Sequence, residues 1–110
     1  MKTKKAINDI KEWFKKNESS LKNELLTCWD DNRYIINGCD ISKELKPYTL
    51  MIYPVYDSPT LADNRWEICC DVYQFSKVHD FGYDNMLADG DSKNGVVDAI
   101  IEAVTKLDLQ

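Results

Sequence analysis

The chain has little of what most catalytic and metal-binding sites are built from. It contains one histidine and four cysteines in 110 residues, and the cysteines stand at positions 28, 39, 69 and 70. Structural zinc sites usually need close pairs such as C-x-x-C, which are missing here, so we expect no metal and no cofactor. His79 has no sequence typical of a Ser or Cys nucleophile beside it. The sequence therefore predicts a protein that is not an enzyme.

Glycine, proline and long apolar runs are also scarce. Four glycines and three prolines leave little material for linkers, and no apolar run approaches the ~18 residues of a membrane span. Residues 1–16 are basic like the start of a signal peptide, but Asn8, Asp9 and other polar residues interrupt their apolar positions. We expect one domain over residues 1–110, located in the cytoplasm with reduced thiols and without membrane contact.

One short run is similar to a calcium-binding loop. The sequence DGDSKNG at 89–95 begins with the required aspartates, but Lys93 stands where a further oxygen ligand is needed. The position of the closing glutamate is occupied by Ile100. We therefore interpret this run as a turn that leads into a helix.

Apolar residues at helical spacing predict helices at both ends of the chain. An amphipathic helix is expected over 3–16, and a second over 20–29 with Ser19 or Ser20 as its cap. A single bent helix through both segments is the alternative. The last helix is expected over 93–108, capped by Asp91 or Ser92. Its apolar face consists of Val96, Val97, Ile100, Ala103, Val104 and Leu107.

Between these helices, three segments have the composition of β-strands. They span 33–41, 48–56 and 65–75, and Gly38 within the first indicates a bulge or a close approach of another backbone. Residues 76–91 have no regular period and are expected to form a long loop. The predicted fold class is α+β, a small antiparallel three-stranded sheet with helices packed on it, in the order α-α-β-β-β-α.

The third strand, RWEICCDVYQF, contains two adjacent cysteines. Because successive residues of a strand point to opposite faces, Cys69 and Cys70 cannot readily bind one metal ion or each other. Cys70 shares its face with Ile68 and is predicted to be inert packing. The opposite face carries Glu67, Cys69, Asp71, Tyr73 and Phe75.

Negative charge is concentrated in one segment. Residues 57–91 contain eight acidic residues but only Arg65 and Lys77 as basic ones, so their formal net charge is −6, whereas the whole chain carries −5. Such a segment repels nucleic-acid phosphates and attracts basic partners. A solvated acidic surface that only maintains solubility is the alternative interpretation.

These features predict a small acidic inhibitor that binds a basic protein. The hypothesis we favour is a bacterial immunity protein that neutralises a nuclease-type toxin by occluding its active site. The predicted partner-binding residues are Glu67, Asp71, Tyr73, Asp80, Asp84, Asp89 and Asp91.

Three alternatives stay open. A phage-encoded inhibitor of a host nucleic-acid enzyme would have the same features. The order of one helix, three strands and a closing helix is similar to that of double-stranded-RNA-binding domains, but the acidic residues near the last helix disfavour RNA, and we expect no nucleic-acid partner. A small enzyme that uses the loop acids and His79 is the third alternative.

Overall fold

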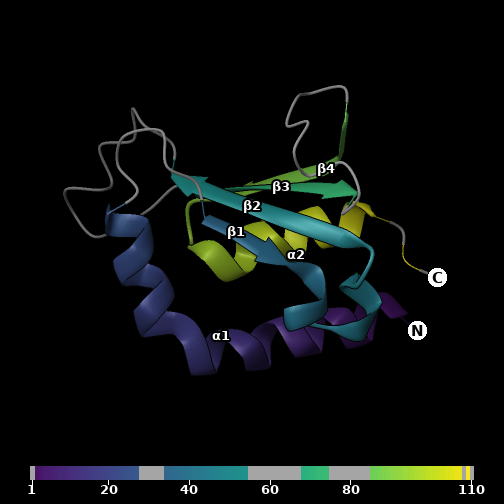
Figure 1. The fold of residues 1–110 in the computed structure, drawn as a ribbon, viewed down its shortest axis with the longest axis horizontal. Coiled ribbons are helices and arrows are strands. Elements are labelled where there is room, and N and C mark those ends of the chain that lie inside the picture. Colours follow the sequence, from purple (N-terminus) through teal and green to yellow (C-terminus); the bar gives the residue numbers. More distant parts are fainter. Residues whose placement is uncertain (1, 28–33, 55–67, 75–84, 108, 110) are drawn as a thin grey trace.

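The computed structural model describes residues 2–27, 34–54, 68–74, 85–107 and 109. Its elements follow one another as one helix, four strands and one helix (Figure 1). They are α1 (Lys2–Thr27), β1 (Tyr34–Asn37), the 3-10 helices η1 (Gly38–Asp40) and η2 (Lys43–Leu45), β2 (Tyr48–Pro54), β3 (Ile68–Gln74), β4 (Met86–Ser92) and α2 (Val96–Lys106). The strands pair antiparallel in the order β1-β2-β3-β4. The predicted α+β class is confirmed, but the predicted three strands and α-α-β-β-β-α order are wrong in detail.

The N-terminal region is one helix and not two. α1 runs through Ser19 and Ser20, the residues expected to cap a separate second helix. The Asn17 side chain donates a hydrogen bond from Nδ2 to the carbonyl oxygen of Trp13, 2.8 Å away and one turn earlier. Polar side chains that bond to the helix backbone in this way bend helices without ending them. Figure 1 shows that the axis of α1 turns part-way along, as the single-bent-helix alternative expects.

The fourth strand is the largest departure from the sequence prediction. Residues 86–91 were expected to belong to the long loop over 76–91, because no regular period was recognised in that segment. They instead form β4, which pairs with β3 from Ile68 opposite Ser92 to Tyr73 opposite Met86. The ladder shifts at Leu87, so this residue is the extra residue of a β-bulge. The added strand also takes the element order away from that of double-stranded-RNA-binding domains.

Gly90 explains why such a sequence pairs in the sheet. A Cβ atom at this position would lie 2.5 Å from the carbonyl oxygen of Ala99 and 2.6 Å from the amide nitrogen of Ala103. Real Cβ atoms do not come so close to backbone atoms, so only glycine lets α2 lie directly against β4. The small side chains of Ala99 and Ala103, both fully buried, complete this contact.

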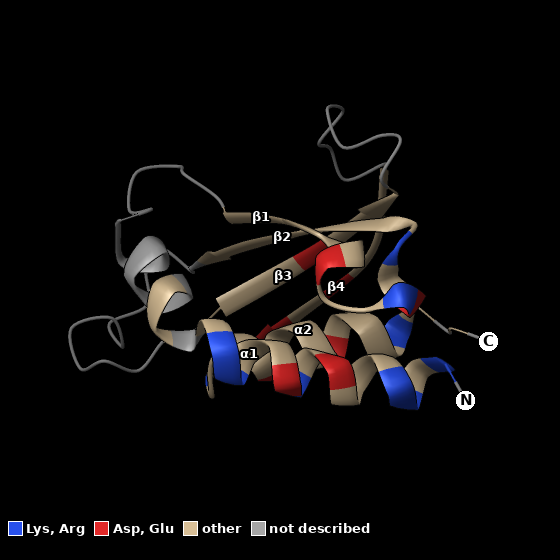
Figure 2. Ribbon diagram, turned by 60° about the horizontal axis from the view of Figure 1, so that its bottom comes forward, with Lys and Arg blue, Asp and Glu red and all other residues tan. Residues whose placement is uncertain are grey.

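Both helices lie on one face of the sheet (Figures 1 and 2). α2 packs against β3 and β4, and α1 packs against α2 and η2. The core between sheet and helices contains alternate residues of the strands, among them Ile36, Leu50, Ile52, Ile68, Cys70, Val72 and Ala88, together with Ala6, Ile10 and Phe14 of α1 and Ile100 and Val104 of α2. The predicted alternation of β3 is therefore confirmed. Burial raises the pKa of the Cys70 thiol, and the neighbouring Asp71 raises it further, so Cys70 is packing.

The first strand is shorter than the predicted 33–41. It ends at Asn37, and the amides of Ile41 and Ser42 both donate to the carbonyl oxygen of Gly38 at 3.0 Å. A Cβ atom at Gly38 would lie 2.0 Å from the carbonyl oxygen of Leu45. The close backbone approach predicted for this glycine is confirmed, and it folds residues 38–47 back on themselves.

The last helix begins later than predicted. α2 starts at Val96 after Gly95, whose φ of 122° is a left-handed conformation that glycine adopts easily. Ser92 is not the helix cap, and its Oγ accepts a hydrogen bond from the Asn94 amide in the preceding turn. Asp91 lies in β4 and is not the cap either. None of the described helices is long and apolar enough to cross a membrane.

We predict that Gly90→Ala lowers the free energy of unfolding by roughly 2–4 kcal/mol, because the new methyl group forces α2 away from β4. Urea unfolding followed by circular dichroism measures this change. The matched control is Lys93→Ala at an exposed position close by, expected to change stability by less than about 0.5 kcal/mol. Equal stabilities of the two variants would contradict the role given to Gly90.

Candidate functional site

Four of the seven predicted partner-binding residues lie on neighbouring strands. Asp71 and Tyr73 belong to β3, and Asp89 and Asp91 belong to β4. Their side chains share the face of the sheet that points away from the helices, which we call the outer face. The other three, Glu67, Asp80 and Asp84, lie outside the described residues, as does His79.

The four strands carry an unusual charge composition. Their only charged residues are Asp71, Asp89 and Asp91, and no Lys or Arg occurs in any of the described strands (Figure 2). The described lysines lie in the helices and in the connections between elements. The described strands therefore contain three carboxylates and no cation, and two of the carboxylates, Asp89 and Asp91, are exposed.

Pairing brings two of these carboxylates together. Asp71 and Asp89 are directly opposite in the β3–β4 ladder, and directly opposite residues have Cβ atoms about 4.5–5.5 Å apart. Asp71 is 7 % exposed, whereas Asp89 is exposed to solvent. The hydroxyl of Tyr53 on β2 donates a hydrogen bond to Asp71 Oδ2 at 3.1 Å and supports the buried carboxylate.

The exposed acidic part of the outer face lies on β4, and Ile35 of β1 is exposed on the same face. Asp89 and Asp91 are exposed, whereas Asp71 and Tyr73 are buried. Leu87 is 51 % exposed and lies two residues before Asp89 in β4. An apolar side chain beside carboxylates is a common composition for a surface that contacts a basic protein. Contact with a partner stays a prediction for all four residues, and β4 supplies the part that is accessible.

The sequence contained a signal for β4 that the expected loop obscured. Leu87, Asp89 and Asp91 alternate with Ala88 and Gly90, and the second set is the buried one. This is the period of a half-buried strand. The opposition of Asp71 and Asp89 follows from the register, which no local pattern reveals.

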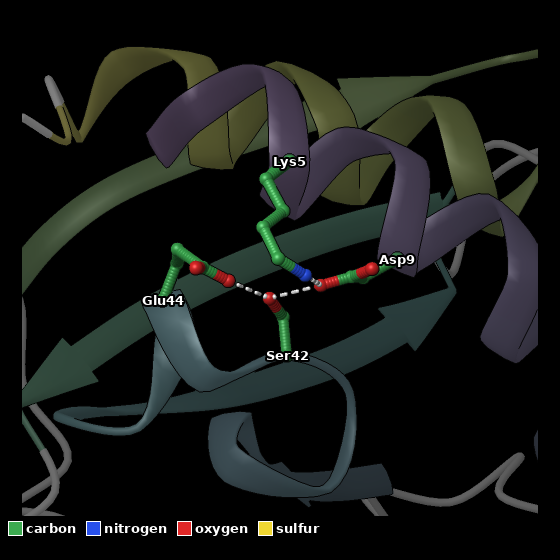
Figure 3. A network of polar contacts seen from close by, with 4 residues as sticks. All are labelled: Lys5, Asp9, Ser42 and Glu44. Carbon is green, nitrogen blue, oxygen red and sulfur yellow. Dashed lines mark hydrogen bonds and ion pairs between the residues drawn. The ribbon is translucent and has the colours of Figure 1, made fainter. Parts of the chain in front are cut away.

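A second polar cluster connects α1 to the segment after β1 (Figure 3). The hydroxyl oxygen of Ser42 lies 2.7 Å from Asp9 Oδ2 and 2.6 Å from Glu44 Oε2. Lys5 lies one helical turn before Asp9, and its Nζ contacts the same Oδ2 at 3.2 Å. Sequence reasoning did not identify this cluster, because Asp9 and Ser42 are 33 residues apart.

The arrangement around Ser42 is not that of a nucleophile. Ser42 is 4 % exposed, so a substrate has no access to its oxygen. Two carboxylates beside the hydroxyl disfavour an alkoxide. Because a hydroxyl has a single hydrogen, it donates to one carboxylate at a time and holds both close to it. We therefore interpret the cluster as a structural contact that holds α1 against η2.

The described residues contain no group of three or more His, Cys, Asp or Glu side chains that could hold a metal ion. Cys39, Cys69 and Cys70 form no disulfide bonds with one another. Asp89 and Asp91, the start of the run that is similar to a calcium loop, are extended in β4 and not curved around a common centre.

Comparisons of the chain with protein-family models, with curated proteins and with solved structures find no match.

The Ser42 cluster predicts a pH dependence of stability. The hydrogen bond from Ser42 lowers the pKa of Asp9 and also that of Glu44, and Lys5 lowers both further. A folded-state pKa below the unfolded value, near 4 for these residues, adds stability above that pH, which is lost as the pH falls through the folded value. Ser42→Ala should cost about 1 kcal/mol at pH 7.

The measurement is urea unfolding of both proteins between pH 7 and pH 3, where we expect the difference in unfolding free energy to shrink with acidification. The control is Thr105→Ala, which removes a hydroxyl on α2 that donates to the carbonyl oxygen of Ile101 and takes no part in the Ser42 cluster. For this variant, the difference in unfolding free energy from the original protein should stay constant over the same pH range. A constant difference for Ser42→Ala as well would mean that its hydroxyl does not stabilise the charged forms.

Proposed function

We propose that this protein is a small inhibitor that binds a basic protein through the outer face at β4. The observation that carries the proposal is the charge composition of the described strands, in which the only charged residues are three aspartates. Two of them, Asp89 and Asp91, are exposed beside Leu87. Exposed carboxylates next to an apolar side chain favour a positively charged partner surface.

Among basic partners, a nuclease is the class we favour. Nuclease active sites attract phosphates with Lys and Arg, and a row of carboxylates can occupy the same positions. The protein would then act as an immunity protein that occludes the active site of a toxin. A phage-encoded inhibitor of a host nucleic-acid enzyme would use the same chemistry and is the second candidate.

The test is to immobilise the intact chain, identify the retained proteins from its source by mass spectrometry, and purify the most abundant one. We expect a basic protein retained in a one-to-one ratio, whose nuclease activity falls when the chain is added in equal amount. Retention of acidic or neutral proteins only, or undiminished nuclease activity, would overturn the proposal.

We predict that the double variant Asp89→Asn, Asp91→Asn weakens binding of that partner by roughly tenfold or more, chiefly through a slower association rate. The dependence of the rate on salt should fall as well. Surface plasmon resonance at several salt concentrations measures both quantities. The matched control is Glu12→Gln with Asp40→Asn, which removes two exposed acids from α1 and η1 and should leave the affinity within about twofold.

A further inference from the structure

β4 is an edge of the sheet within the described residues. The strand order places β3 on one side of it, and none of the described strands pairs with its other side. An edge strand has backbone N–H and C=O groups available for a further strand. We infer that β4 accepts an extended basic segment of the partner as an added strand, with Lys or Arg side chains at alternate positions opposite Asp89 and Asp91. The inference rests on the proposed function and specifies how the partner binds.

The spacing of the two exposed aspartates supports an extended ligand. Asp89 and Asp91 are two residues apart on one strand and share the outer face, so their side chains project side by side. In an added strand, residues two apart would face them directly, at the distance of cross-strand pairs. Each cation would then lie in the same row as one of the two exposed aspartates.

The bulge at Leu87 marks one end of the pairing. Bulges twist a strand and interrupt its ladder, so an added strand would pair with residues 88–92. The exposed side chain of Leu87 would then contact an apolar residue that follows the two basic positions of the partner. For an antiparallel partner, the complementary pattern is basic–x–basic–x–apolar.

The same charges exclude a second copy of this chain as the occupant. Antiparallel pairing of two β4 strands centred on Gly90 places Asp89 of one copy opposite Asp91 of the other, and pairing centred on Asp89 places the two Asp89 residues opposite each other. Either register brings carboxylates together without a cation from the strands. Acidic edge strands resist self-association for this reason, and they pair more favourably with a basic strand.

The test compares two peptides of the same composition against the intact protein. The first is acetyl-Thr-Lys-Thr-Lys-Thr-Val-Thr-amide, and in the second the two lysines are adjacent, so that they point to opposite faces of a strand. Binding is followed by the NMR amide shifts of residues 86–92. We expect the alternating peptide to bind about tenfold more tightly, and methylation of its bonding amides to abolish the preference. Asp89→Asn with Asp91→Asn should reduce it to about twofold or less.

Equal binding of the two peptides, or shifts outside β4, would overturn strand addition. If the peptides bind equally while the double Asn variant still loses the basic protein partner, strand addition is wrong and the proposed function stands. If the alternating peptide is preferred but no basic protein is retained by the chain, the proposed function is wrong and strand addition stands. Dimerisation in light scattering that β4 variants abolish would assign the edge to a second copy.

Discussion

The direct contact between α2 and the backbone of β4 is the constraint on which the sheet depends. β4 consists of residues with low strand propensity, so its place at the edge is secured by packing and not by local preference. Gly90 permits that packing because it has no side chain, and Ala99 and Ala103 bring the helix backbone close. The contact also fixes the register with β3 that sets Asp89 opposite Asp71. The charge arrangement of the outer face is therefore a consequence of how a helix on the other face is packed.

Features that depend on neighbouring residues could be predicted from the sequence, whereas features that depend on contacts between distant segments could not. The alternation of β3 and the apolar face of α2 are local patterns, and both were predicted correctly. The continuity of α1 was misjudged, because Ser19 and Ser20 are good helix caps and equally tolerable on an exposed helix surface. β4 was missed because its place depends on residues of α2 some ten positions later. The acids of the candidate site were chosen from the strand period and the charge of the segment, but their opposition across two strands required the structure.

The two faces of the sheet differ in composition. The helix-facing side holds the aliphatic core and supplies most of the hydrophobic stabilisation. The outer face holds the three aspartates and the exposed Leu87, and it also buries Met51 and Tyr73. The Ser42 cluster is on the helical side and keeps α1 in place at a distance from this surface.

The complete burial of Cys70 beneath α2 provides an internal reporter of motion between the layers. A thiol reagent reaches this sulfur only when the helix layer separates from the sheet, whereas Cys39 is exposed and Cys69 half-buried, so both are accessible in the closed state. The raised pKa of Cys70 suppresses reaction of the closed form still further. The alkylation rate of this one cysteine therefore measures how often the protein opens far enough to expose the core between helices and sheet. A ligand that tightened β4 against α2 would be detected as slower labelling, even though it never touched the cysteine.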